Sequence, residues 1–106
     1  MTRIQIEKTE GKIGIVCVGH AGYSNPGTDI VCAGISAMMC AWQAKCMELY
    51  ERNQITIEKW NVEFGNIEIV IHTESKEILE AFSVVEIGLK LIWQQYTEYI
   101  EWCGEK

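Results

Sequence analysis

The chain has 106 residues, 48% of them hydrophobic and 23% charged, a balance typical of one globular domain rather than a disordered segment. Its net charge of -6 argues against general nucleic-acid binding. The first residues lack the apolar region of a signal peptide, and no apolar stretch approaches the roughly 18 residues of a membrane span. Five cysteines, an odd number, fit a reducing compartment. We therefore expect a single cytoplasmic domain over residues 1–106.

The first part of the chain predicts two strands and a loop. Apolar and polar residues alternate over residues 3–8, which is typical of a strand with one buried face. After a turn at 9–12, residues 13–20 are β-branched and almost wholly apolar, which indicates a more central strand. Residues 21–28 hold two glycines and the only proline, so they are expected to form a loop.

A helix is predicted over residues 29–52, and its first half is apolar on nearly all sides. Residues 55–72 predict two strands that join in a tight turn at Gly65–Asn66. Cap candidates at Thr73 and Ser75 then open a long helix.

That last helix is predicted to run to about Trp102, with an apolar stripe wider than one sheet contact requires. The element order is therefore β-β-α-β-β-α. It predicts an α+β domain in which an antiparallel sheet carries both helices on one face. The surplus apolar surface favours a homodimer.

The stretch GHAGYSNPGTDIVC, residues 19–32, carries the main indication of chemistry. It places His20 12 positions before Cys32. A cysteine attacks carbonyl carbon as its thiolate, and the first turn of a helix favours an anion. A nearby imidazole can take the thiol proton and later protonate the leaving amine. The residues alone leave two interpretations open: a nucleophile with its base, or a strand and a helix that contain His and Cys incidentally.

Other residues of this stretch would order such a site. The N–H groups of the first helical turn are candidate donors to an oxyanion, and Gly19 would allow close approach of the backbone. Ser36 lies one helical turn after Cys32, so its hydroxyl can reach the sulfur or a substrate. Asp29 can cap the helix, but its charge opposes a thiolate. Tyr23 either contacts a substrate or covers the site.

The motifs GHAGY and GTDIVCAGIS, at this spacing, resemble the ribosomal-processing cysteine protease family Prp of bacteria such as Firmicutes, and the likeness covers nearly the whole chain. The resemblance implies that His20 and Cys32 are the catalytic pair. It places the family's recurrent Asp and Ser at Asp29 and Ser36, and the glycine of its mobile loop at Gly27.

The same resemblance implies a small dimeric cysteine endopeptidase that removes a short N-terminal extension from a large-subunit ribosomal protein, while homologues process phage capsid or scaffold proteins. Its substrate loop would include Gly19, Gly22, Tyr23 and Gly27. The Ser-Asn-Pro sequence in that loop and Gly34 depart from the family's pattern. A non-catalytic dimeric module that binds the same ribosomal or phage segment is the alternative function.

No cofactor, metal, nucleic acid or membrane is expected as a partner. A zinc site would need Cys17 and His20, which lie three apart on a predicted strand and therefore point to opposite faces. Cys40 and Cys46 are expected to fill the core.

Overall fold

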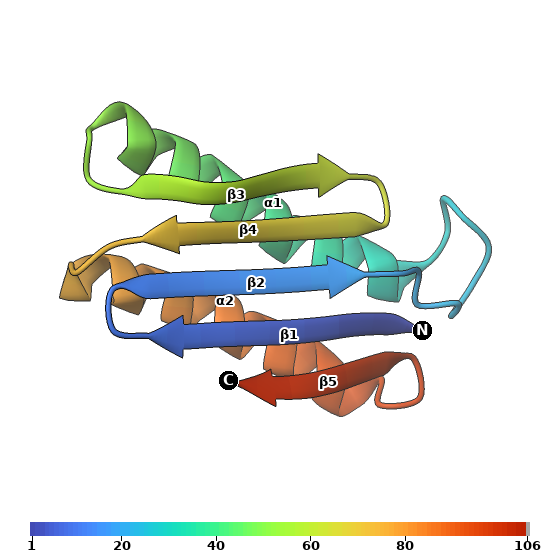
Figure 1. The fold of residues 1–106 in the computed structure, drawn as a ribbon. Helices are drawn as coiled ribbons and strands as arrows, with labels where there is room; N and C mark the ends of the chain where they lie inside the picture. The colour runs from blue at the N-terminus through green and yellow to red at the C-terminus, as the bar shows by residue number, and fades with distance from the viewer. Residues whose placement is uncertain (106) are drawn as a thin grey trace.

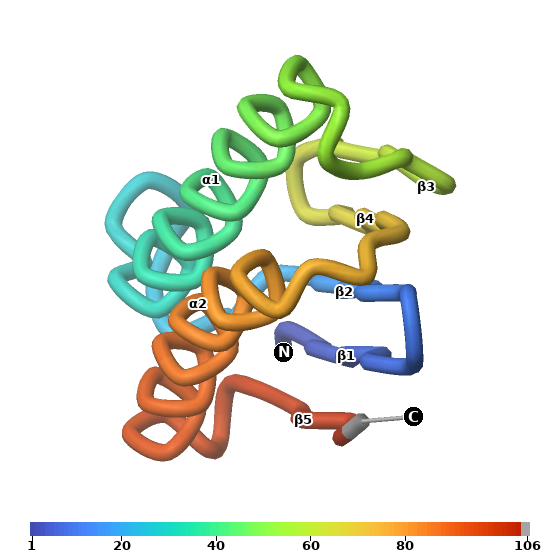
Figure 2. The backbone as a smooth tube through the Cα atoms, turned by 90° about the vertical axis from the view of Figure 1, so that its left-hand side faces the viewer, coloured from blue at the N-terminus to red at the C-terminus, as the bar shows by residue number. Residues whose placement is uncertain are grey.

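The computed structural model describes residues 1–105 and arranges them in two layers, a five-stranded sheet and two helices (Figure 1). The strand order is β3-β4-β2-β1-β5, and both helices cover the same face of the sheet (Figure 2). The predicted α+β class is confirmed. The elements are β1 (Thr2–Thr9), β2 (Lys12–Val18), α1 (Ile30–Glu51), β3 (Thr56–Glu63), β4 (Asn66–His72), α2 (Lys76–Gln95) and β5 (Ile100–Glu105).

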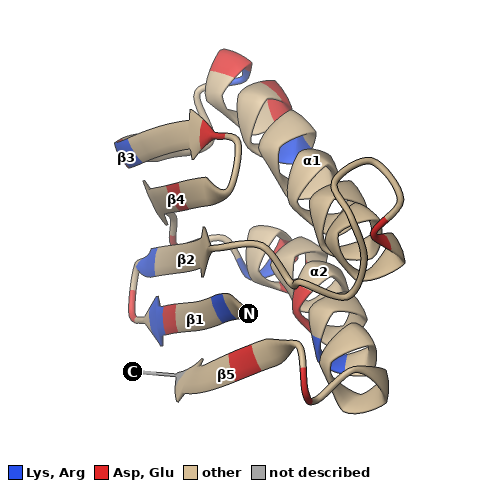
Figure 3. Ribbon diagram, turned by 90° about the vertical axis from the view of Figure 1, so that its right-hand side faces the viewer, with Lys and Arg blue, Asp and Glu red and all other residues tan. Residues whose placement is uncertain are grey.

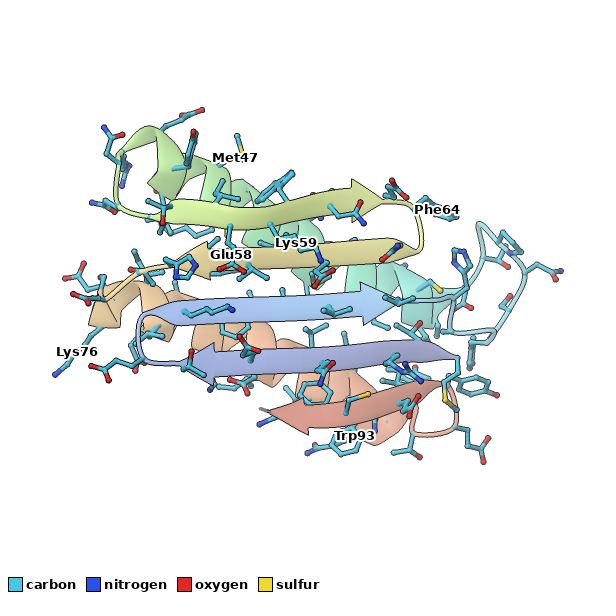
Figure 4. The ribbon with its side chains drawn as sticks, in the orientation of Figure 1. Met47, Glu58, Lys59, Phe64, Lys76 and Trp93 are labelled. Atoms are coloured by element: carbon cyan, nitrogen blue, oxygen red, sulfur yellow. The ribbon has the colours of Figure 1, made fainter. Side chains whose placement is uncertain are left out.

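Alternation along the strands divides the sheet into an apolar face and a polar face. The isoleucines on the helix side of β1, β2 and β4 are almost fully buried: Ile4, Ile6, Ile13, Ile15, Ile69 and Ile71. The opposite face carries ion pairs such as Lys59 with Glu68 at 3.0 Å, and Glu58 and Lys59 are visible on it in Figure 4. The core therefore lies wholly between the sheet and the helices.

Helix α1 has nearly the predicted bounds, with Asp29 as its N-cap and Arg52 as its C-cap. One side packs into the core through Val31, Ile35, Met39, Trp42, Cys46 and Leu49. Cys46 fills the core as predicted, whereas the same prediction for Cys40 was wrong, because Cys40 lies on the exposed side. The expectation that no stretch could span a membrane also needs correction. Helix α1 has a mean hydropathy of 1.3 and, by length and composition alone, is long and apolar enough to cross a membrane.

The C-terminal part of the chain differs from the prediction. Helix α2 ends at Gln95 rather than near Trp102, and the residues after it form β5, which pairs with β1 in parallel. The expected order lacked this strand. The sequence hides it because no Gly or Pro separates the helix from the strand, and Tyr96 and Tyr99 continue the helical spacing of apolar residues.

The two helices approach each other closely at a glycine. A Cβ atom on Gly34 would lie 3.3 Å from Cδ1 of Ile92 in α2. The absence of a side chain at Gly34 therefore lets α2 lie close against α1.

The turn between β3 and β4 is displaced by one residue from the predicted Gly65–Asn66. Asn66 already pairs with Glu63, so Phe64 and Gly65 form the turn. Gly65 has a φ of +78°, while Phe64 has no positive φ. This arrangement places the Phe64 side chain at the tip of the hairpin, where it is 91% exposed.

Candidate active site

The predicted site residues gather at the end of the sheet where β2 leaves it, beside the β3–β4 turn and the start of α1 (Figure 1). Gly19 follows β2 with a φ of +92°, and its N–H donates to the Gly65 carbonyl at 2.8 Å. A Cβ on Gly19 would lie 2.6 Å from the carbonyl oxygen of Met1. Glycine is therefore required here by both conformation and space, which refines its predicted role in close backbone approach.

Cys32 lies in the first turn of α1, as predicted, and its side chain is partly exposed. Its Sγ atom accepts a hydrogen bond from the backbone N–H of Ala21 at 3.2 Å. Ala21 directly follows His20, so this bond ties the nucleophile candidate to the chain segment that carries the base candidate.

Asp29 joins the loop to the helix. Its Oδ1 accepts the N–H groups of Val31 and Cys32 at 3.0 Å, and its Oδ2 accepts those of Tyr23 and Ser24 at 2.9 and 3.2 Å. The bond from the Cys32 N–H, assisted by those from the loop and Val31, lowers the pKa of Asp29 below its usual value. The carboxylate therefore acts as the helix cap, and it is only 8% exposed.

These bonds limit one prediction. The Val31 and Cys32 N–H groups, which were candidate oxyanion donors, are both engaged by Asp29. The N–H of Ala33 donates to the Asp29 carbonyl at 3.0 Å. Ser36 lies exposed one turn beyond Cys32, as its spacing predicts.

Loop 21–28 folds over the start of α1 and is held on both sides. The Tyr23 ring packs edge-on against Tyr96 and Tyr99, with centroid distances of 5.5 and 5.2 Å. The hydroxyls of Ser24 and Thr28 lie 2.7 Å apart, within hydrogen-bond distance. Tyr23 thus fastens the loop to the connection between α2 and β5.

Gly22 and Gly27 have φ values of +74° and +89°, which L side chains rarely adopt. A Cβ at either position would have no atom within 4 Å. Both glycines are therefore needed for the bends of the loop rather than for space. Both glycines lie in the segment that the sequence predicts to be a loop.

His20 is exposed and points to the β3–β4 turn. Its ring centroid lies 4.9 Å from that of Phe64, and a Cβ on Gly65 would come within 2.9 Å of its Cε1 and Nε2 atoms. No hydrogen bond joins the imidazole to Cys32 in the described chain. The structure thus brings the two residues to one site without pairing them.

Cys17 lies behind Cys32 in the core. Burial raises its pKa to about 12, and the adjacent Cys32 adds to this effect. Cys17 therefore remains a thiol at neutral pH and does not compete as a nucleophile.

Two further features bear on ligands. Among the side chains of residues 1–104, no three from His, Cys, Asp or Glu converge as metal ligands would. A hollow of about 430 Å³ lies between the end of α1 and the start of α2 and is lined by Lys45, Arg52 and Ser75 among others. It shares no residue with the site around Cys32.

Sequence reasoning missed four residues of this site: Ala21, Phe64, Tyr96 and Tyr99. The Ala21 N–H could not be found, because its bond depends on the fold of the loop. Phe64 could have been found, because it directly precedes the predicted hairpin turn at Gly65–Asn66. Tyr96 and Tyr99 continue the apolar spacing of the predicted last helix, so the sequence favours a packing role for both.

Comparison with known proteins gives a family and a fold. The family described as cysteine protease Prp matches residues 1–101. No curated protein sequence matches the chain.

Solved structures with the same fold include two of the ribosomal processing protease Prp from S. aureus, both 23% identical to the chain. One, with a covalently linked product peptide, has a TM-score of 0.77 and covers 100% of both chains. The other, with a substrate peptide, has a TM-score of 0.67 and covers 98% of this chain and 99% of that one. SMU.848 from Streptococcus mutans is 17% identical, with a TM-score of 0.68 and coverage of 100% and 96%.

Proposed function

Because the chain belongs to the cysteine protease Prp family, we propose that it removes a short N-terminal extension from a large-subunit ribosomal protein, or from a related phage structural protein. The S. aureus relative of the same fold is a ribosomal processing protease. The observation that carries the proposal is the position of Cys32. Its partly exposed thiol lies in the first turn of a capped helix and accepts the N–H of the residue that follows His20.

In the proposed reaction, Cys32 Sγ attacks the scissile carbonyl carbon while His20 accepts the thiol proton. The imidazolium then protonates the leaving amine as the C–N bond breaks, which leaves an acyl-enzyme. Water hydrolyses the thioester, with His20 again accepting a proton. Each step needs the imidazole near Sγ, so His20 must leave the β3–β4 turn when the peptide binds.

Asp29 and Ser36 support this site in different ways. Asp29 holds the loop and the first turn of α1 in one arrangement, so its role is positional. The exposed Ser36 hydroxyl would contact the peptide or the sulfur from the next turn. The loop with Gly19, Gly22, Tyr23 and Gly27 would open to admit the peptide and close over it.

The assembly we propose is a cytoplasmic homodimer. Helices α1 and α2 expose large apolar side chains. The charged residues of α1 lie toward its C-terminal end (Figure 3). We call the surface formed by the apolar side chains the helix face, and its large members are Val84, Ile87, Leu91 and Met47, exposed by 42% to 66%. A second copy of the chain would bury it. Five free thiols suit a reducing compartment.

Intact mass spectrometry of a ribosomal precursor with its N-terminal extension tests the function. The wild type should shorten the precursor, whereas Cys32→Ala should lower the rate at least a thousandfold because no other group replaces the nucleophile. Cys103→Ala, which removes an exposed thiol on β5, is the matched control and should cleave normally.

Cleavage that survives in Cys32→Ala would rule out the thiol mechanism. Binding of the precursor without cleavage by the wild type would support the alternative, a non-catalytic dimeric module that recognises the same segment. A phage capsid or scaffold precursor in the same assay separates the two substrate classes.

A further inference from the structure

Phe64 is the most exposed large apolar side chain in the part of the chain that the structure describes, yet its ring makes a defined contact. It lies at the tip of the β3–β4 hairpin, 91% exposed, and Figure 4 shows it at the end of β3. The His20 ring packs against it at 4.9 Å with an interplanar angle of 43°. Tilted aromatic pairs at this distance attract each other beyond the area that they bury.

Gly65 completes the surface under His20. A Cβ at this position would approach the imidazole Cε1 and Nε2 to 2.9 Å, so the ring lies directly against the Gly65 backbone. The Gly65 carbonyl accepts the Gly19 N–H at 2.8 Å, which fixes the turn to the residue before His20. Phe64 and Gly65 together form what we call the His20 seat.

We propose that the His20 seat restrains the imidazole before substrate binds, and that Phe64 is a positioning residue for the base. This inference rests on the roles proposed above for His20 and Cys32. While His20 occupies the seat, the hydrogen bond to Cys32 Sγ comes from the Ala21 N–H. Catalysis then requires two coupled changes, departure of His20 from the seat and rearrangement of the loop that begins at Ala21.

Removal of the Phe64 ring should therefore release His20 more often. An aromatic pair of this kind corresponds to roughly a two- to tenfold change in an equilibrium. In Phe64→Ala, alkylation of Cys32 by iodoacetamide at pH 7 should accelerate by about that factor, because the freed imidazole reaches the thiol more often and accepts its proton. The reaction is followed by peptide mapping, so the other cysteines do not interfere.

Three variants make the result specific. In a His20→Gln background, Phe64→Ala should leave the Cys32 alkylation rate unchanged, because the effect passes through the imidazole. Phe64→Tyr keeps the aromatic face and should react like the wild type. Val62→Ala removes a 40% exposed side chain two residues away on β3 and should also react like the wild type.

Proton NMR supplies a direct readout of the contact. The His20 ring protons should lose their ring-current shift in Phe64→Ala and keep it in Phe64→Tyr, with His72 as an internal reference. An unchanged or slower alkylation rate in Phe64→Ala would overturn the proposal, as would a gain that persists without His20. No peptide is cleaved in these measurements, so they can fail while the proposed protease function holds, and the reverse.

Discussion

At Asp29, one carboxylate accepts backbone N–H groups from two separate segments, the first turn of α1 and the loop before it. An Asp before an apolar helical run predicts the bonds to the helix. The bonds to Tyr23 and Ser24 could not be predicted, because they exist only when the loop folds back over the helix start. The sequence therefore shows which residues belong to the site but not which atoms they engage.

Asn at position 29 separates these two tasks. Asn caps helices about as well as Asp, but its NH2 group cannot accept the N–H groups of Tyr23 and Ser24. In Asp29→Asn we expect unchanged helix content by circular dichroism and faster amide exchange in loop 21–28.

The same variant should alter the response to acid. Hydrogen bonds in the folded protein lower the pKa of Asp29 below its usual 3.8. Its carboxylate therefore stabilises the fold above about pH 3.8, and this contribution is lost as the pH falls through the lower folded value. Urea unfolding from pH 7 to 3 should show a steeper loss for the wild type than for Asp29→Asn, and parallel profiles would contradict the assigned bonds.

Among the elements, β1 to β4 and α1 follow from the sequence, whereas the end of α2 and β5 do not. Period-2 alternation and the caps define β1, β4 and α1 because each buries its own apolar face locally. β5 forms instead because the free edge of β1 offers backbone hydrogen bonds to a segment about 98 residues away, as the Arg3–Glu101 pair shows. Such long-range pairing overrides local helical spacing.

The contacts of Tyr23 with Tyr96 and Tyr99 predict that the segment between α2 and β5 stabilises loop 21–28. Each edge-on aromatic pair is favourable by about 0.5–1.5 kcal/mol. In Tyr99→Leu, amide hydrogen exchange of loop 21–28 should therefore accelerate by roughly two- to tenfold. Tyr50→Leu, which changes an exposed tyrosine near the end of α1, is the control and should leave the loop unchanged. Equal exchange in wild type and Tyr99→Leu would show that the contact does not hold the loop.

For the whole molecule, the informative feature is the width of the apolar stripe on α2, because it predicts apolar side chains that the sheet does not cover. The line Val84, Ile87 and Leu91 exceeded what the sheet contact needs, and these side chains are exposed in the single chain. The spacing of apolar residues along the helix predicts the surplus, whereas the surface that it forms depends on how the two helices pack. The fold class was therefore predictable, whereas the helix face required the structure.

A charge on the helix face should separate the proposed dimer. In Ile87→Glu, sedimentation velocity should give a monomer where the wild type gives a dimer, because a carboxylate buried between subunits loses its hydration. Val62→Glu places the same charge on an exposed apolar site of β3 and should remain dimeric. A wild type that is monomeric at micromolar concentration would contradict the assembly.

The parallel pairing of β5 with β1 also sets an order of events during synthesis. Tyr96 and Tyr99, which hold Tyr23, leave the ribosome after every other residue of the site, and β1 keeps an open edge until β5 arrives. A nascent chain that still lacks Tyr96 and Tyr99 therefore lacks the aromatic contacts that hold loop 21–28 in place. The site therefore closes only after the elements from β1 to α2 have been synthesised, and a ribosome stalled before residue 96 would carry a protease domain whose loop lacks the Tyr96 and Tyr99 contacts.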